Sequence, residues 1–176
     1  NAWEYGHQSD REDLKANSMK VFDSYLKNGF TPVGFFKESV DFDKGYEDPV
    51  HSIRRQSEGI YAMLHFLAYE KENGRRHPEW EQKMKNMLDI LLRLQQADGS
   101  FPRKFRDDFT IVDTSGGSTP SATLPLVMGY KYFKDKRYLA SAKQTADYLE
   151  KVLISKADYF SSTLDANCED KEASLY

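Results

Sequence analysis

The chain has 176 residues, of which 39% are hydrophobic, 14% aromatic and 30% charged. This length is typical of one domain and is sufficient to bury a hydrophobic core. Eleven tyrosines and eleven phenylalanines argue against disorder, because disordered chains are poor in aromatic residues. The net charge is −3 and there is no lysine-rich run, so we expect no nucleic-acid partner.

Compartment and anchoring leave few signals in the sequence. The single cysteine, Cys168, cannot form an internal disulfide, so the redox compartment stays open. No apolar run approaches the roughly 18 residues that span a bilayer, and no signal-peptide pattern opens the chain. We therefore expect no membrane partner. Because the chain starts at Asn1 and ends on what reads as the opening of a helix, we expect a fragment of a longer protein. Its localisation is unknown, although the periplasm or secretion is favoured if it acts on a polysaccharide.

Helical spacing of apolar residues dominates the chain, and sustained strand alternation is nearly absent. The first predicted helix begins at Ser9 or Asp10 and ends near Lys27, just before Gly29. Four more helices are predicted at about 52–73, 78–97, 120–133 and 136–154. Pro78 suits a first helical turn, where the amides have no intrahelical partner. The sequence therefore predicts an all-α fold.

A repeat relates these helices. Segments 79–101 and 137–160 superpose, with Trp80 on Tyr138, and each helix runs into a turn and a phenylalanine. A second kind of helix start is shared by SEGIYA (57–62), PSATLP (120–125) and KEASLY (171–176). The unit is therefore a helical hairpin that recurs every 50 to 60 residues, in which two helix types alternate. A unit of this size is typical of an array or a closed ring.

Alternating helices in such hairpins, with an outer helix ending in LQQADGSFP (94–102), resemble the α/α toroids of carbohydrate-active enzymes. That superfamily includes many glycoside hydrolases, several polysaccharide lyases and sugar epimerases, and its six hairpins close into a ring of inner and outer helices. The resemblance implies that residues 1–176 form a single all-α domain, about half of an (α/α)6 toroid. It also implies a partner, which is either the remaining half of the ring or a second copy.

The repeat sorts the connections into two kinds. Turns from an inner to an outer helix are short, at 72–79 and 134–136. Connections from an outer to an inner helix are long, at 29–51, 98–119 and 155–170. Long loops at one end of a scaffold are where function is usually built. The resemblance places the mouth of an active-site cleft at that end, beside the N-termini of the inner helices.

Acidic residues are frequent in the long loops. Glycoside hydrolysis needs two carboxyl groups, about 5 Å apart for retention or about 6.5–9.5 Å apart for inversion. We expect Asp165 to be one of them, because its loop opens an inner helix and carries aromatic residues. Asp113 or Glu58 is the expected second member. The alternative is structural, since a carboxylate at a helix start is favoured by the helix dipole alone and Asp113 can cap a turn.

Further residues are candidates for holding a sugar. They are His51, Arg54, Arg103, Asp108, Tyr159 and Glu169. Arginine suits a uronic acid through paired hydrogen bonds. Arg54 and Arg55 diverge by about 100° on a helix, so at most one of them faces the cleft. The four histidines and Cys168 lack metal-binding spacing, so we expect neither a metal nor a cofactor.

The sequence thus favours a glycoside hydrolase-like enzyme that acts on an oligosaccharide by carboxylate acid–base catalysis. The nearest alternative is a polysaccharide lyase of the same fold, with His51 as base and Arg54 neutralising a uronate. A non-catalytic helical-repeat domain that binds carbohydrate or protein also stays open. An isoprenoid cyclase is disfavoured, because the acidic pair at 107–108 is too short a motif. Half a ring exposes inner surfaces, so we expect the fragment to be inactive alone or to self-associate.

Overall fold

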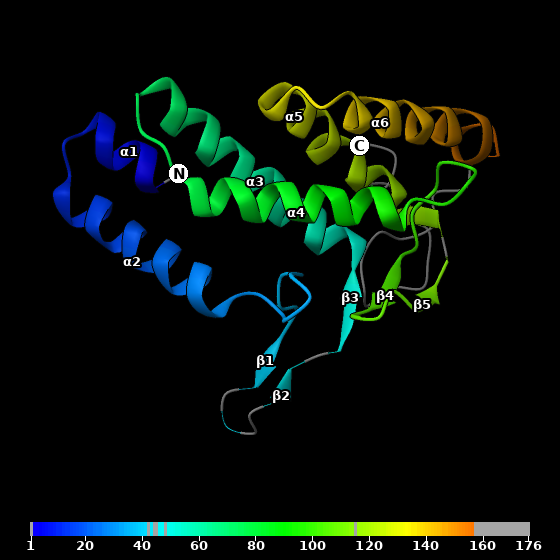
Figure 1. The fold of residues 1–176 in the computed structure, drawn as a ribbon, viewed down its shortest axis with the longest axis horizontal. Coiled ribbons are helices and arrows are strands. Elements are labelled where there is room, and N and C mark those ends of the chain that lie inside the picture. The colour runs from blue at the N-terminus through cyan, green and yellow to red at the C-terminus, as the bar shows by residue number, and fades with distance from the viewer. Residues whose placement is uncertain (1, 42, 44–45, 48, 115, 157–176) are drawn as a thin grey trace.

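The computed structural model describes residues 2–41, 43, 46–47, 49–114 and 116–156. Helices dominate this part of the chain (Figure 1). They are α1 (Ala2–Gln8), α2 (Glu12–Asn28), α3 (Ile53–Glu72), α4 (Pro78–Leu94), α5 (Thr123–Phe133) and α6 (Lys136–Tyr148). A 3₁₀ helix (Gly116–Ala122) leads into α5, and a π-helical turn (Leu149–Ile154) follows α6. Each predicted helix is present, and the all-α class is confirmed.

The start of the chain differs from the prediction, which had a single helix beginning at Ser9 or Asp10. The structure has two helices there, and α1 and α2 form an antiparallel hairpin (Figure 1). Asp10 adopts a φ of 54°, a left-handed conformation that cannot continue a right-handed helix. The backbone therefore breaks at Asp10, and α2 begins after Arg11 in extended conformation.

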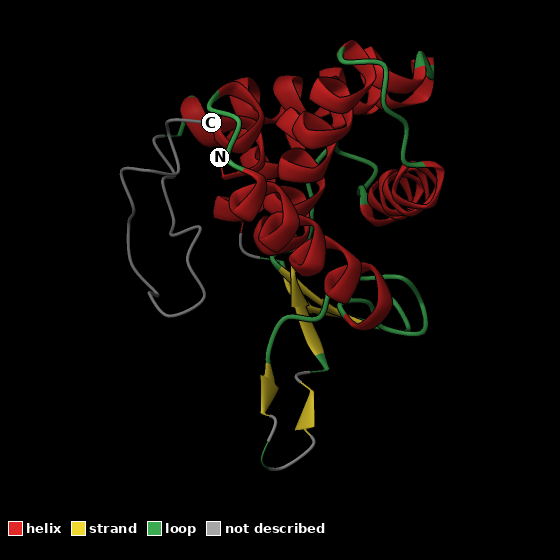
Figure 2. Ribbon diagram, turned by 90° about the vertical axis from the view of Figure 1, so that its left-hand side faces the viewer, coloured by secondary structure: helices red, strands yellow, loops and turns green. Residues whose placement is uncertain are grey.

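Short strands occupy the long loops, and the sequence analysis did not predict them. They are β1 (Val40–Asp41), β2 (Tyr46–Glu47), β3 (Val50–Ser52), β4 (Lys104–Arg106) and β5 (Ile111–Asp113). β1 and β2 form one antiparallel pair, and the other three form a sheet in the order β3–β4–β5. Strands of two or three residues are too short to show alternation. All of them lie at one end of the helices (Figure 2).

The core lies where α3, α4, α5 and α6 pack together. Leu64 of α3, Leu88 of α4 and Leu126 of α5 are fully buried. The two residues that the repeat superposes, Trp80 and Tyr138, are both buried near the start of an outer helix. Equivalent positions of the repeat are thus both buried in the core, which supports the repeat. In the described part of the chain, no helix is long and apolar enough to cross a membrane.

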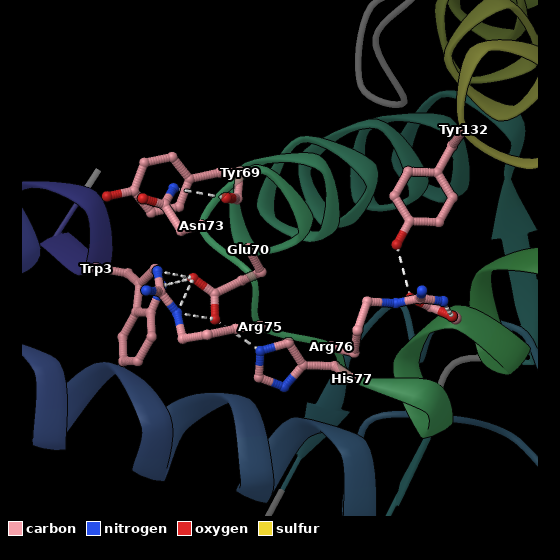
Figure 3. A network of polar contacts seen from close by, with 9 residues as sticks. Trp3, Tyr69, Glu70, Asn73, Arg75, Arg76, His77 and Tyr132 are labelled. Carbon is pink, nitrogen blue, oxygen red and sulfur yellow. Dashed lines mark hydrogen bonds and ion pairs between the residues drawn. The ribbon is translucent and has the colours of Figure 1, made fainter.

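The end opposite the strands carries short turns, as predicted. α3 connects to α4 through residues 73–77, and α5 connects to α6 through residues 134–135. Glu81 fixes this end because it joins three elements: Arg76 of the turn binds it through two nitrogens at 2.6 and 2.7 Å. The Tyr132 hydroxyl of α5 donates to Glu81 at 2.7 Å (Figure 3). The short turns therefore form a rigid base.

Candidate functional site

The first two long loops meet in the β3–β4–β5 sheet. β3 belongs to the first loop and leads directly into α3, whose N-cap is Ser52. β4 and β5 belong to the second loop, which leads into α5. β3 and β4 pair in register, with His51 opposite Phe105, and the Ile53 amide donates to the Arg103 carbonyl at 3.1 Å. The predicted common end is therefore confirmed for these two loops.

Arg103 and Asp113 lie on the two neighbouring stretches of the second loop. The Arg103 amide donates to the Asp113 carbonyl at 2.8 Å, and Arg103 Nη1 lies 3.5 Å from Asp113 Oδ2. The Arg103 side chain is 5% exposed and that of Asp113 is 30% exposed. The two residues thus form a half-buried ion pair between the start of β4 and the end of β5. A ligand that reached Asp113 would have to compete with a guanidinium already in place.

Arg54 and Glu58 form a second ion pair, on the accessible side of α3. Arg54 Nε lies 2.8 Å from Glu58 Oε1, which is the four-residue spacing that aligns side chains on a helix. The neighbouring Arg55 points elsewhere and reaches Glu38 at 3.3 Å. The expected divergence of the two arginines is therefore observed. Arg54 and Glu58 stand together near the first turns of an inner helix, where the prediction placed them.

His51 is the candidate whose surroundings differ most from a binding site. Its side chain is only 1% exposed, and its ring stacks on Phe35 with centroids 4.8 Å apart. Nε2 lies 2.7 Å from Asp107 Oδ1, across the sheet from β3. The contact ties the β4–β5 turn to the first loop. His51 therefore has a structural role, which is to hold the first two long loops together. Its contact with a substrate stays a prediction.

The β4–β5 turn holds Asp108. Its carboxylate accepts the Thr110 amide at 2.9 Å, and this hydrogen bond lowers the pKa of Asp108. Phe109 adopts a φ of 68°, uncommon for a bulky residue, and the Arg93 guanidinium lies 3.6 Å from the centre of its ring. The turn is thus held in a strained conformation by contacts on both sides. The predicted contact of Asp108 with a substrate stays a prediction.

Three candidates, Asp165, Tyr159 and Glu169, lie outside the described residues. Their predicted roles therefore stay predictions, as does the pairing of Asp165 with Asp113 or Glu58. Within the described ranges, no group of three or more His, Cys, Asp and Glu residues could hold a metal ion.

Two acidic residues in the same loops have roles that the sequence did not reveal. The Glu38 side chain is 1% exposed and accepts hydrogen bonds from the Ser52 amide at 2.7 Å and from Gln56 Nε2 at 3.0 Å. Glu38 therefore fixes the first loop to the start of α3. Asp107 does the same for the second loop through His51. No local signal marks either residue, because their partners lie 14 to 56 positions away.

Alternating inner helices (α3, α5) and outer helices (α2, α4, α6), with long loops joined at one end, define about half of an α/α toroid. No family model matches the sequence. Two solved structures share the fold. The cellobiose 2-epimerase from Bacillus thermoamylovorans B4167 superposes with a TM-score of 0.66 over 88% of this chain at 16% identity. A sugar epimerase from a ruminal bacterium superposes with a TM-score of 0.64 over 81% of this chain, also at 16% identity.

Both solved structures are α/α toroids, which confirms the predicted fold. The chain spans 38% of the first and 36% of the second. At this identity the likeness establishes the fold.

Proposed function

We propose that this chain is part of a carbohydrate-active enzyme of the α/α-toroid class, with its sugar site at the end where the long loops meet. The sheet that joins two of these loops beside the N-termini of the inner helices carries the proposal. This sheet and the start of α3 beside it carry two ion pairs, Arg54 with Glu58 and Arg103 with Asp113. The fold shared with two enzymes described as sugar epimerases supports the same class.

The two ion pairs suit a ligand rich in hydroxyl groups. Guanidinium groups only donate hydrogen bonds and carboxylates only accept them, whereas each sugar hydroxyl does both. A sugar therefore has complementary partners on α3 and on the β4–β5 segment. A uronic acid would in addition pair with Arg54 in place of Glu58.

The first candidate reaction is hydrolysis. Asp165, with Asp113 or Glu58, would act as the acid and the base or nucleophile at the glycosidic bond. Glu58 and Asp113 each already contact an arginine, which holds both carboxylates in place at this end of the helices.

The second candidate reaction is epimerisation of a sugar unit, which the two solved structures favour. Inversion at a carbon next to a carbonyl proceeds by removal and return of a proton, and therefore needs a positioned base and acid. The same loop-end residues supply such groups. The two reactions leave different products, so product analysis separates them.

The test is binding followed by product analysis. Oligosaccharides with neutral and with uronic units are titrated into the chain, and the arginine side-chain resonances of Arg54 and Arg103 are followed by NMR. We expect both signals to shift with a neutral or a uronic oligosaccharide in the wild type, and the Arg103 signal to stay unshifted in Arg54→Ala, with Lys20→Ala on α2 as the matched control. If no oligosaccharide shifts them at saturating concentration, the proposal is wrong.

Product analysis in deuterated water then assigns the reaction. New reducing ends indicate hydrolysis. An inverted carbon that carries deuterium indicates epimerisation, and absorbance from an unsaturated uronide indicates a lyase. Binding without turnover favours the non-catalytic alternative or a site that needs the rest of the ring.

A further inference from the structure

α2 is the least covered long helix of the described chain. It has 17 residues, and none of them is fully buried. Two apolar residues one turn apart on it, Val21 and Tyr25, are 63% and 44% exposed. In water such a stripe is unfavourable, since about 25 cal/mol is lost for each Å² of apolar surface left uncovered.

This stripe forms one wall of a groove. The groove has a volume of about 350 Å³, and α3 provides the opposite wall. Its lining is mainly apolar and includes Val21, Phe22, Tyr25, Gly59, Ala62 and Met63. The groove therefore lies between α2 and α3, and residues 36–38 of the first loop and Trp80 of α4 complete its lining.

One end of this groove is continuous with the seat of α1. α1 packs against α2, and its Trp3 ring lies 6.1 Å from Phe66 of α3. Phe66 in turn contacts Phe22 of α2, with centroids 4.4 Å apart. Ala62 and Met63 lie one helical turn from Phe66 along α3. The groove thus begins beside the N-terminal end of α1, and like α1 it lies between α2 and α3.

The length of the groove corresponds to a short helical segment. Its lining on α3 runs from Met63 to Arg55. Eight residues of helix rise about 12 Å, which equals about two turns of an occupying helix. From Met63 to Gly59 the α3 wall offers small or apolar side chains, and Gln56 and Arg55 beyond them are polar.

The opposite end of the groove is polar. There the buried Glu38 carboxylate accepts hydrogen bonds from Ser52 and Gln56 at the start of α3. An adjoining hollow is lined by Ser24, Asn28 and Ser39 together with Glu38. A helix in line with α1 would place its N-terminus here.

We infer that this groove is the seat of an amphipathic α-helix that continues the line of α1, antiparallel to α2, and that the rest of the ring supplies it. Continuity with the α1 seat fixes its direction, and the apolar walls fix its inward stripe. The inference concerns assembly of the ring and does not depend on which sugar chemistry the loop end performs.

The test extends the full chain at its N-terminus by ten residues of a designed helix. In one version the apolar residues continue the Trp3 side of α1. In the matched version the same residues are moved by two positions, which turns the stripe by about 200°. Val21→Cys in a Cys168→Ser background reports accessibility, because a thiol at position 21 reacts with an added maleimide only when the groove is open.

We expect the aligned extension to slow labelling at position 21 about tenfold, equivalent to about 1.4 kcal/mol of seating free energy. It should also raise the thermal unfolding midpoint, whereas the turned extension should change neither. Equal protection by both versions, or by neither, overturns the inference. Concentration-dependent protection of the unextended chain, with a dimer in sedimentation, would assign the groove to a second copy and also overturn it.

Discussion

The indole Nε1 of Trp3 donates a hydrogen bond to Glu70 Oε1 at 2.7 Å, which links α1 to the far end of α3. The Glu70 side chain is almost fully buried, and Arg75 binds both of its oxygens at 2.6 to 3.0 Å. His77 Nε2 lies 2.7 Å from Oε2 (Figure 3). One carboxylate thus holds α1, the end of α3 and the turn into α4 together.

Replacing this carboxylate by an amide should destabilise the chain. In Glu70→Gln the new NH₂ group would face the donors of Arg75 and His77, and the partly exposed Arg75 guanidinium would lose its counter-charge. We expect the free energy of unfolding to fall by about 3 kcal/mol, as measured by urea denaturation. Glu72→Gln, at an exposed position of the same helix, is the matched control and should change it by less than about 0.5 kcal/mol. Equal losses in the two variants would contradict the role of Glu70.

The same residue should give the chain an acid-sensitive component of stability. Burial alone would raise the pKa of Glu70, but hydrogen bonds from Arg75, His77 and Trp3 outweigh it and lower the pKa to about 2. Because the folded pKa lies below the unfolded value, the stabilisation is present above about pH 5 and is lost as the pH falls towards 2. The loss is at most about 3 kcal/mol.

This component is measured as a difference. Unfolding free energies of the wild type and of Glu70→Gln are compared at each pH, so that other acidic groups cancel. We expect the gap between the two proteins to narrow as the pH falls from 5 to 2. A gap that stays constant over this range would show that Glu70 does not titrate with folding.

The turn after α4 should not tolerate a side chain at Gly99. Its φ is 92°, and a Cβ there would lie 2.4 Å from the backbone oxygen of Gln144 in α6. We expect Gly99→Ala to lower the thermal unfolding midpoint and to cost more than about 2 kcal/mol, from backbone strain and steric overlap together. Gly74→Ala is the control, since Gly74 has a φ of 74° and open space around it. If both variants lose the same stability, packing against α6 is not the constraint.

The contact between His51 and Asp107 should control the order of the β4–β5 turn. Removing the acceptor in Asp107→Ala leaves a buried imidazole nitrogen without its partner, and we expect a loss of about 1–2 kcal/mol. Hydrogen exchange at the Phe109 and Thr110 amides should become faster than in the wild type. Asp107→Asn keeps an acceptor oxygen and should retain most of the protection. Unchanged exchange in Asp107→Ala would show that the sheet alone holds the turn.

Local signals were sufficient to predict the helices from α2 to α6, whereas α1 was missed. Pro78 predicted the first turn of α4, and the repeat predicted that a turn and a phenylalanine follow this helix. In the structure, Asp98 Oδ1 accepts the Ser100 amide at 3.0 Å, as turn chemistry requires. These features depend on residues close together in the chain, so they can be read from the sequence.

The candidate site was only partly predictable, because its geometry depends on distant contacts. That Arg54 and Arg55 diverge follows from helix geometry. The burial of His51 could not be predicted in this way, because Phe35 and Phe105, from two different segments, enclose its ring. Pairing of β3 with β4 likewise joins residues about 50 positions apart. The pairing of Asp165 with Glu58 or Asp113 stays a prediction.

The pairing of β3 with β4 also bears on how such a protein can change over evolution. At the short-turn end, each connection is self-contained and can be altered within one hairpin. At the sheet end, consecutive hairpins share backbone hydrogen bonds, so an insertion in one loop shifts the register of the next. A change of length in one loop at this end therefore requires a matching change in the other, and transplanting one hairpin alone from another toroid would break the backbone pairing that the two loops share.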